Sequence, residues 1–258
     1  MLNKLLLYGK PNPVQFAYQV TVTAAQATTP KFTFATGTPS AQIDWGDGSV
    51  YEAVTSAVEL THTYTVAGTY IVQLLMPNQE KWLTQIDISS DKLSKVITPI
   101  QAFRNLTLFY AYSNTAWAQN ISGWVLPASL VNFYVSSTSV SGDISGWVLP
   151  ASLVHFAVSS TSVSGSPIFT STVALSNFQY QNCALPQATV DLIVSRIYDR
   201  RISFTAAAPS ANVGGTNAAP SGVYQDEDPP VTGKGYIYEL VNDPEVEGFK
   251  KWAITYNA

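Results

Sequence analysis

The sequence predicts a mainly β protein, built as a small β-sandwich followed by a short solenoid of stacked strands with a C-terminal cap. Three observations predict this fold. Short runs of alternating apolar and polar residues, separated by turn residues, fill the first third of the chain. A 23-residue segment is then repeated almost letter for letter, since its copies begin at Ile121 and Ile144 and 144 − 121 = 23. After the repeat come a segment with helical spacing and a Gly- and Pro-containing loop.

Composition limits the classes of function. Charged residues make up only 12% of the 258 residues and hydrophobic residues 46%, so the chain can bury a sizeable core. A net charge of −4 argues against nucleic-acid partners, which require a basic face. No apolar run approaches the ~18 residues of a membrane-spanning helix, so we expect no membrane insertion. One cysteine and two histidines leave little for metal or acid–base chemistry, and we expect no metal site and no cofactor.

The first module is predicted to be a sandwich of short strands. Residues 16–23 alternate in polarity, residues 31–34 form a second strand, and later strands follow at 60–64 and 70–74. Its most specific motif is Asp44-Trp-Gly-Asp-Gly48, followed by His62-Thr-Tyr64 and then Gly68-Thr-Tyr-Ile-Val72. This combination resembles the polycystic-kidney-disease (PKD) type of immunoglobulin-like domain. The resemblance implies a sandwich over residues 18–77 that serves as a spacer or adhesion module. Residues 1–17 are expected to form either an N-terminal arm that packs on a neighbouring subunit or a strand or tail of the sandwich.

The two aspartates of this motif allow two interpretations. They resemble a carboxylate pair or a calcium site, but aspartates in such a turn also cap backbone amides. We expect Asp44 and Asp47 to cap the turn, and we expect His62 to be a packed, hydrogen-bonded strand residue and not a ligand.

The repeat predicts a solenoid over residues 83–205. Each copy carries an apolar frame, Leu130, Phe133, Val135, Thr138 and Val140 in the first and Leu153, Phe156, Val158, Thr161 and Val163 in the second. Similar frames flank the copies, and the strand positions are Ile86, Tyr110, Phe133, Phe156, Phe178 and Ile202. A single strand cannot bury its apolar face alone, so neighbouring strands must stack in parallel. The frame resembles the leucine-rich repeat, with Asp91, Thr115, Thr138, Thr161 and Cys183 at its asparagine position.

Two residue types in the repeat have competing interpretations. Cys183 is expected to be a structural residue at the turn and not a nucleophile. Trp124 and Trp147 lie on the return path of the repeat, where core packing is favoured over stacking on sugars.

The C-terminal region is predicted to close the solenoid. Val190, Ile193, Val194 and Ile197 have helical spacing within residues 186–200. Residues 206–258 form a loop and a cap, whose last segments, 236–240 and 252–256, are a short helix or strand pair. The order of these modules resembles leucine-rich surface proteins of gut-type Bacteroidetes bacteria and structural proteins of their phages. These relatives bind or scaffold, and the resemblance supplies no catalytic residues.

No motif of an enzyme is present in the sequence, so we expect a non-enzymatic protein without catalytic residues. The first hypothesis is a phage virion surface protein: a capsid decoration, head-fibre or tail-associated protein. Its expected partners are other virion proteins of the capsid or tail, its own copies, and a host cell-surface protein or glycan. The start of the chain lacks the pattern of an export signal, which favours assembly inside the cell. The alternative is a bacterial cell-surface, extracellular adhesin or glycan-binding protein.

A ligand of the solenoid is expected on the concave strand face. Residues between the frame positions point to that face, and the candidate binding residues are Phe109, Asn132, Tyr134, His155, Asn177 and Gln179. This stripe is amide and aromatic with almost no charge, which suits hydrogen bonding and stacking on sugar or on a polar protein surface. A face that merely contacts solvent is the competing interpretation.

Overall fold

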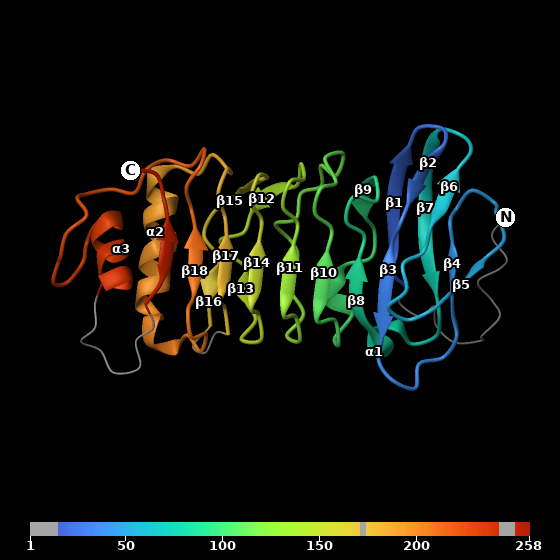
Figure 1. Ribbon diagram of the computed structural model, residues 1–258, viewed down its shortest axis with the longest axis horizontal. Helices are drawn as coiled ribbons and strands as arrows, with labels where there is room; N and C mark the ends of the chain where they lie inside the picture. Colours follow the sequence, from blue (N-terminus) through green and yellow to red (C-terminus); the bar gives the residue numbers. More distant parts are fainter. Residues whose placement is uncertain (1–14, 171–173, 243–250) are drawn as a thin grey trace.

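The structure is a computed structural model that describes residues 15–170, 174–242 and 251–258. Over these residues the chain is mainly β: an antiparallel N-terminal sheet is followed by a β-solenoid of about four turns, with little helix. The two parts lie end to end along the long axis of the molecule, and the strands cross that axis (Figure 1). The expected mainly β class is therefore confirmed. The expected N-terminal arm lies outside the described residues, apart from its last three positions.

The N-terminal part is an antiparallel sheet with the strand order β5-β4-β7-β1-β9, accompanied by the antiparallel pair β2–β6. Along β1 the side chains alternate between core and surface, because successive residues of a strand point to opposite faces. The strands of this part are β1 (Ala17–Val22), β2 (Gln26–Thr28), β3 (Lys31–Phe34), β4 (Ala41–Asp44), β5 (Glu52–Val54), β6 (His62–Tyr64), β7 (Gly68–Leu75) and β9 (Leu93–Val96).

The solenoid is organised around one large sheet with the order β19-β18-β17-β14-β11-β10-β8-β3. From β8 to β19 all pairs are parallel and without register shifts. The middle residue of β10, β11, β14 and β17 is a buried phenylalanine, and the rings of Phe109, Phe133, Phe156 and Phe178 stack with centroid distances of 5.9, 5.8 and 5.3 Å. The strands are β8 (Leu83–Asp87), β10 (Leu108–Tyr110), β11 (Asn132–Tyr134), β14 (His155–Ala157), β17 (Asn177–Gln179), β18 (Ser210–Asn212) and β19 (Ala253–Thr255).

Short strands and helices complete the turns. Two parallel pairs, β12–β15 and β13–β16, form the other walls of the middle turns. Helix α2 replaces these short strands in a later turn, and its buried residues Val190, Ile193, Val194 and Ile197 confirm the expected helix. The remaining elements are α1 (Gln79–Trp82), β12 (Ser141–Asp143), β13 (Val148–Leu149), β15 (Ser162–Ser164), β16 (Ile168–Phe169), α2 (Gln187–Asp199) and α3 (Gly233–Asn242), with 3₁₀ turns at Ile100–Ala102 and Arg201–Ser203.

Two details of the expected repeat frame are wrong. In the turn before the copies, the buried strand residue is Phe109 and not Tyr110, so the frame begins one residue earlier than expected. Ile202 lies in a 3₁₀ turn and is 60% exposed, whereas the next strand is β18, inside the expected loop. The reason is the insertion of α2, which lengthens this turn and moves the following strand further along the chain.

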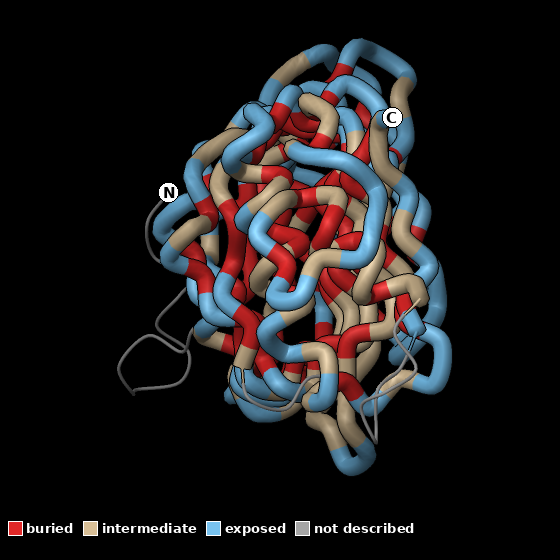
Figure 2. Tube along the Cα trace, turned by 90° about the vertical axis from the view of Figure 1, so that its left-hand side faces the viewer, coloured by how far each residue is buried: buried red, intermediate tan, exposed pale blue. Residues whose placement is uncertain are grey.

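The two parts of the molecule share one core. Strand β3 of the N-terminal part pairs with β8 in an antiparallel arrangement and so extends the large sheet. Conversely, β9 follows β8 in the chain but pairs with β1. Viewed from the C-terminal end, the buried segments form a continuous interior surrounded by exposed loops (Figure 2). The expected modules, 18–77 and 83–205, are thus joined by hydrogen-bonded strands from both sides.

A ladder of polar side chains closes the turn after each strand. We call this set the turn ladder: Asp91, Asn114, Thr138, Thr161, Cys183 and Asn217, all buried. Asn114 donates to the carbonyl of Ile88 at 2.9 Å and accepts from the amide of Leu93 at 3.1 Å. Thr138 donates to a carbonyl at 2.7 Å, and the Cys183 thiol lies 3.6 Å from the Thr161 hydroxyl. The structural role expected for Cys183 is confirmed.

The two tryptophans of the repeat belong to the core. Trp124 and Trp147 are 9% and 4% exposed. Their rings meet Phe109 and Phe133 edge to face at 5.9 and 5.8 Å. The core-packing interpretation is confirmed, and these side chains are not available for stacking on a ligand.

Candidate binding face

Strands β8, β10, β11, β14, β17 and β18 of the large sheet each present two side chains away from the core, one on each side of a buried residue. The parallel register aligns these side chains into two rows across the sheet. We call the two rows the outward face. The first row is Gln85, Leu108, Asn132, His155, Asn177 and Ser210, and the second is Asp87, Tyr110, Tyr134, Ala157, Gln179 and Asn212.

Aromatic side chains cluster at one place on this face. The rings of Tyr110 and Tyr134 meet edge to face at a centroid distance of 4.8 Å. The ring centroid of Tyr112, a residue that is 40% exposed, lies 6.1 Å from that of Tyr110. The ring centroid of His155 lies 6.2 Å from that of Tyr134. Partial burial raises the pKa of Tyr134, and burial together with the charge of Asp87 raises that of Tyr110. Both phenols therefore remain neutral hydrogen-bonding groups at physiological pH.

Amide side chains occupy the neighbouring positions. Asn132 and Asn177 flank His155 in the first row, and all three are half-buried. The amide of Gln179 donates to Asn177 Oδ1 at 2.5 Å, which orders this pair of side chains. Each primary amide offers both donors and an acceptor, so this part of the face can donate hydrogen bonds to a ligand and accept hydrogen bonds from it.

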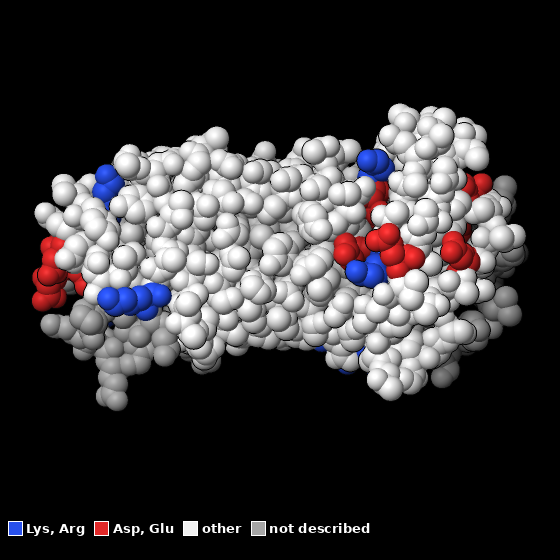
Figure 3. All heavy atoms as spheres, viewed as in Figure 1, with Lys and Arg blue, Asp and Glu red and all other residues white. Residues whose placement is uncertain are grey.

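The middle of the outward face carries no charge. Between Arg104 and Asp191 the sequence holds one charged residue, Asp143, which lies in β12 on another wall of the solenoid. Figure 3 shows the resulting uncharged surface over the middle strands, with charged side chains near the two ends. At the N-terminal end Lys31 and Asp87 approach to 4.0 Å.

The structure places the expected site residues as follows. Asn132, Tyr134, His155, Asn177 and Gln179 lie in the two rows of the outward face. Phe109 does not, because its ring is fully buried in the phenylalanine stack. Its place on the face is taken by Tyr110, with Tyr112 beyond it, and sequence reasoning missed both tyrosines. The signal that identifies them is Asn114, which marks the asparagine position of that turn and fixes the frame one residue earlier.

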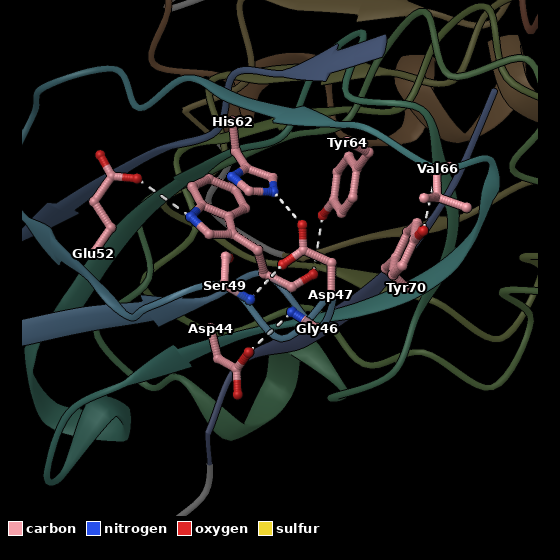
Figure 4. A network of polar contacts seen from close by, with 10 residues as sticks. Asp44, Gly46, Asp47, Ser49, Glu52, His62, Tyr64, Val66 and Tyr70 are labelled. Atoms are coloured by element: carbon pink, nitrogen blue, oxygen red, sulfur yellow. Dashed lines mark hydrogen bonds and ion pairs between the residues drawn. The ribbon is translucent and has the colours of Figure 1, made fainter. Parts of the chain in front are cut away.

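The aspartates of the N-terminal motif form a structural network (Figure 4). Asp44 accepts from the amide of Gly46 at 2.9 Å and Asp47 from that of Ser49 at 3.0 Å, so the expected caps are confirmed. His62 stacks on Trp45 at 4.6 Å and contacts Asp47 at 2.8 Å, as expected for a packed strand residue. Partial burial by itself raises the pKa of Asp47, but the hydrogen bonds from Ser49 and His62 outweigh it and lower the pKa.

The structure also has a pocket away from the outward face. A cavity of about 260 Å³ lies between β16 and α2, lined by Ile168, Phe169, Arg196, Asp199 and Arg200. The Arg196 guanidinium beside it already donates to the carbonyls of Ser166 and Pro167, at 2.5 and 3.1 Å. Within residues 15–170, 174–242 and 251–258, no group of three or more His, Cys, Asp or Glu side chains is placed so that it could hold a metal ion. None of the described helices is both long and apolar enough to cross a bilayer.

Comparison with known proteins gives no match: no protein-family model, curated protein or solved structure matches the chain. Function is therefore inferred from the residues of the outward face.

Proposed function

We propose that the chain is a non-enzymatic surface protein of a bacteriophage particle, which makes assembly or attachment contacts through the outward face of its large sheet. One observation carries the proposal. The face is uncharged across β10, β11, β14 and β17, yet it is rich in amide and aromatic side chains held in two ordered rows.

The chemistry of this face favours recognition. Binding a partner to a charged face removes water from ions, which is costly unless each ion meets a counterpart. The amides and phenols of the outward face lose less on desolvation and regain hydrogen bonds with a polar partner. Tyrosine in addition supplies a large contact area at a small cost in conformational entropy. Such a face suits repeated polar contacts with a surface.

The build of the molecule supports the same function. In this proposal the antiparallel part is a PKD-type immunoglobulin-like domain, as the motif from Asp44 to Gly48 suggests, and the solenoid is of the leucine-rich type. Asn114 and Asn217 stand at the turn-ladder position that this type reserves for asparagine. Domains of the first kind serve as spacers and arrays of the second kind as binding surfaces.

The partners in this proposal are capsid or tail proteins, further copies of the chain, and a protein or glycan of the host surface. A bacterial surface adhesin would use the same face, so the location of the protein separates the two settings. Antibodies against the chain should label purified phage particles in electron micrographs. Labelling of bacterial envelopes without labelling of particles would favour the adhesin.

Removing the aromatic centre of the face tests the proposal. The double variant Tyr134→Ala, His155→Ala should lose attachment to the partner surface, at least about tenfold, because it deletes two adjoining contact groups. A matched control is Val125→Ala together with Val148→Ala, since these valines are 63% and 54% exposed on another wall of the same turns. Binding of purified protein to particles and to host cells is measured. Equal loss in both double variants, or in neither, would refute a role of the outward face.

A further inference from the structure

We infer that the ligand of the outward face is an uncharged linear glycan, which lies across the strands and runs parallel to the long axis of the molecule. The inference rests on the proposed function, because it names the ligand class of the same face. Three features of the face support it: the spacing of the rows, the placement of the tyrosines and the absence of charge from the middle strands.

The spacing of the rows fits a polymer with short repeating units. Neighbouring strands of a sheet lie about 4.8 Å apart, so a chain crossing the strands meets a new side chain of each row at that interval. An extended chain of β-linked sugars advances by a similar distance per sugar. The two rows are separated by two residues along each strand, about 6.7 Å, which is comparable to the width of a sugar ring. One sugar can thus lie over each strand and contact both rows.

The tyrosines supply stacking surfaces within this arrangement. Tyr110 and Tyr134 lie on adjacent strands in the same row, and their rings are nearly perpendicular, with an angle of 84°. A ligand that passes over them therefore meets aromatic surface in two orientations. Sugar rings present C–H groups on one side, and these pack on aromatic faces.

The amides supply the hydrogen bonds that sugar hydroxyls require. Asn132 lies beside Tyr134 in the same strand, at the opposite position across the buried Phe133. Further along the face, Gln179 orders Asn177 through its hydrogen bond to Asn177 Oδ1, and this bond does not use the Asn177 amide hydrogens. A hydroxyl group donates and accepts, as these amides do. A ligand that crosses the strands would therefore meet the tyrosines over β10 and β11 and the amides of Asn177 and Gln179 over β17.

The absence of charge selects against acidic polymers. A uronate, sulfate or phosphate group placed over β11 or β14 would lose water without meeting a lysine or arginine, because the nearest such residues along the chain are Arg104 and Arg196. Binding of an uncharged glycan should also be insensitive to salt, since no charge is screened.

The test measures binding of immobilised polysaccharides by the full chain. The probes are uncharged polymers (β-glucan, mannan and galactan) and acidic ones (alginate and hyaluronate). We expect binding of at least one uncharged polymer, with the same affinity at about 0.05 and 0.5 M NaCl. Tyr134→Ala and Tyr110→Ala should each weaken it by about tenfold. The matched control is Tyr51→Ala, because Tyr51 is 39% exposed and lies between β4 and β5, outside both rows. Circular dichroism verifies that each variant is folded.

Treated host cells separate a failure of this inference from a failure of the proposed function. Periodate destroys sugars and protease removes proteins. Loss of cell binding after periodate alone supports a glycan. If protease alone abolishes cell binding and Tyr134→Ala still binds untreated cells weakly, the ligand is a protein. That result overturns the glycan inference but keeps the outward face as the binding site. Binding of the acidic polymers alone, or affinity that falls steeply with salt, also overturns the inference. If no substitution on the outward face changes the affinity, the proposed function is overturned as well.

Discussion

The N-terminal part and the solenoid are stabilised in different ways. The N-terminal part relies on irregular contacts between particular polar side chains, such as the stacking of His62 on Trp45 and the contact of His62 with Asp47. The solenoid relies on the repetition of one arrangement. The turns of β10, β11, β14 and β17 each combine a buried ring, a polar side chain of the turn ladder and backbone hydrogen bonds. The contacts of the N-terminal part involve charged residues, whereas those that repeat in the solenoid involve almost none.

This difference shows why the outward face is free to carry a binding function. In the solenoid, stability comes from residues directed inward, so the outward rows can vary without loss of the fold. The two repeat copies differ at only three positions, and two of those differences, Asn132 against His155 and Tyr134 against Ala157, lie on the outward face.

Removal of a ring from the phenylalanine stack should have the largest effect. Phe133→Ala deletes a fully buried side chain that contacts the rings of Phe109, Phe156 and Trp147, and it should lower the free energy of unfolding by about 4 kcal/mol. The matched control is Tyr134→Ala in the same strand, directed outward, with an expected loss of about 1 kcal/mol or less. Urea unfolding followed by circular dichroism measures both. Similar losses would contradict the separation of inward stability from outward function.

The buried carboxyl at the junction of the two parts should give the next largest effect. Burial raises the pKa of Asp91 to about 7, and the charges of Asp87 and Glu59 add to this, although the hydrogen bond from the amide of Thr29 opposes it. The folded state therefore favours the protonated form. The resulting stability is complete below the pKa of the unfolded chain and is lost as the pH rises through about 7.

Asp91→Asn should remove this pH dependence, because asparagine is neutral and already occupies the same turn-ladder position at Asn114. The variant should be more stable than the parent by up to about 4 kcal/mol at pH 8, and the gain should vanish near pH 4. Melting temperatures across this pH range are the measurement. A gain of equal size at both pH values would show that the carboxyl does not titrate as the structure indicates.

Substitution in the N-terminal network should have a smaller effect. His62→Ala removes the stacking on Trp45 and the contact with Asp47, and it should cost about 1.5 kcal/mol. Because β3 pairs with β8, we expect the N-terminal part and the solenoid to unfold in one transition even in this variant. Separate transitions in differential scanning calorimetry would instead show that the two parts are independent.

The smallest effect is expected in the turn ladder. Thr138→Val keeps the shape of the side chain but removes the hydroxyl that donates to the Val135 carbonyl at 2.7 Å, at a cost of about 1 kcal/mol. Thr161→Val repeats the test one turn later, where the hydroxyl also contacts Cys183. The two costs, measured by urea unfolding, should agree within about 0.5 kcal/mol if the turns are equivalent. Clearly unequal costs would show that turns of nearly identical sequence differ in the stability that their turn-ladder hydrogen bonds provide.

The sequence was most informative where the repeat is literal. The two copies place Phe133 and Phe156 in the core and Asn132, Tyr134 and His155 outward, because identical segments must stack in the same register. It failed one turn earlier, where two frames offset by one residue both place aromatic residues at the core position. A shift of one residue exchanges the two faces of a strand, so Phe109 and Tyr110 exchanged places.

The joining of the two parts was not predictable from local patterns. Residues 31–34 were predicted as a strand of the first module and residues 93–96 fall within the predicted solenoid, yet β3 pairs with β8 and β9 pairs with β1. Alternation of residue type indicates which face of a strand is buried but does not identify the neighbouring strand. The strand β18 was missed for a related reason: Ser210, Ala211 and Asn212 have little intrinsic preference for a strand and are held by pairing with β17 and β19.

The orientation of the large sheet has a mechanical consequence. Its strands cross the long axis, so the hydrogen bonds between turns run along that axis (Figure 1). A force that pulls the two ends of the molecule apart therefore acts on the backbone hydrogen bonds between one pair of neighbouring strands after another. Each such pair is only a few residues long. Turns would detach singly, and each of about 23 residues would release about 80 Å of extended chain. A protein that links a particle to a cell surface would in this way yield gradually under tension.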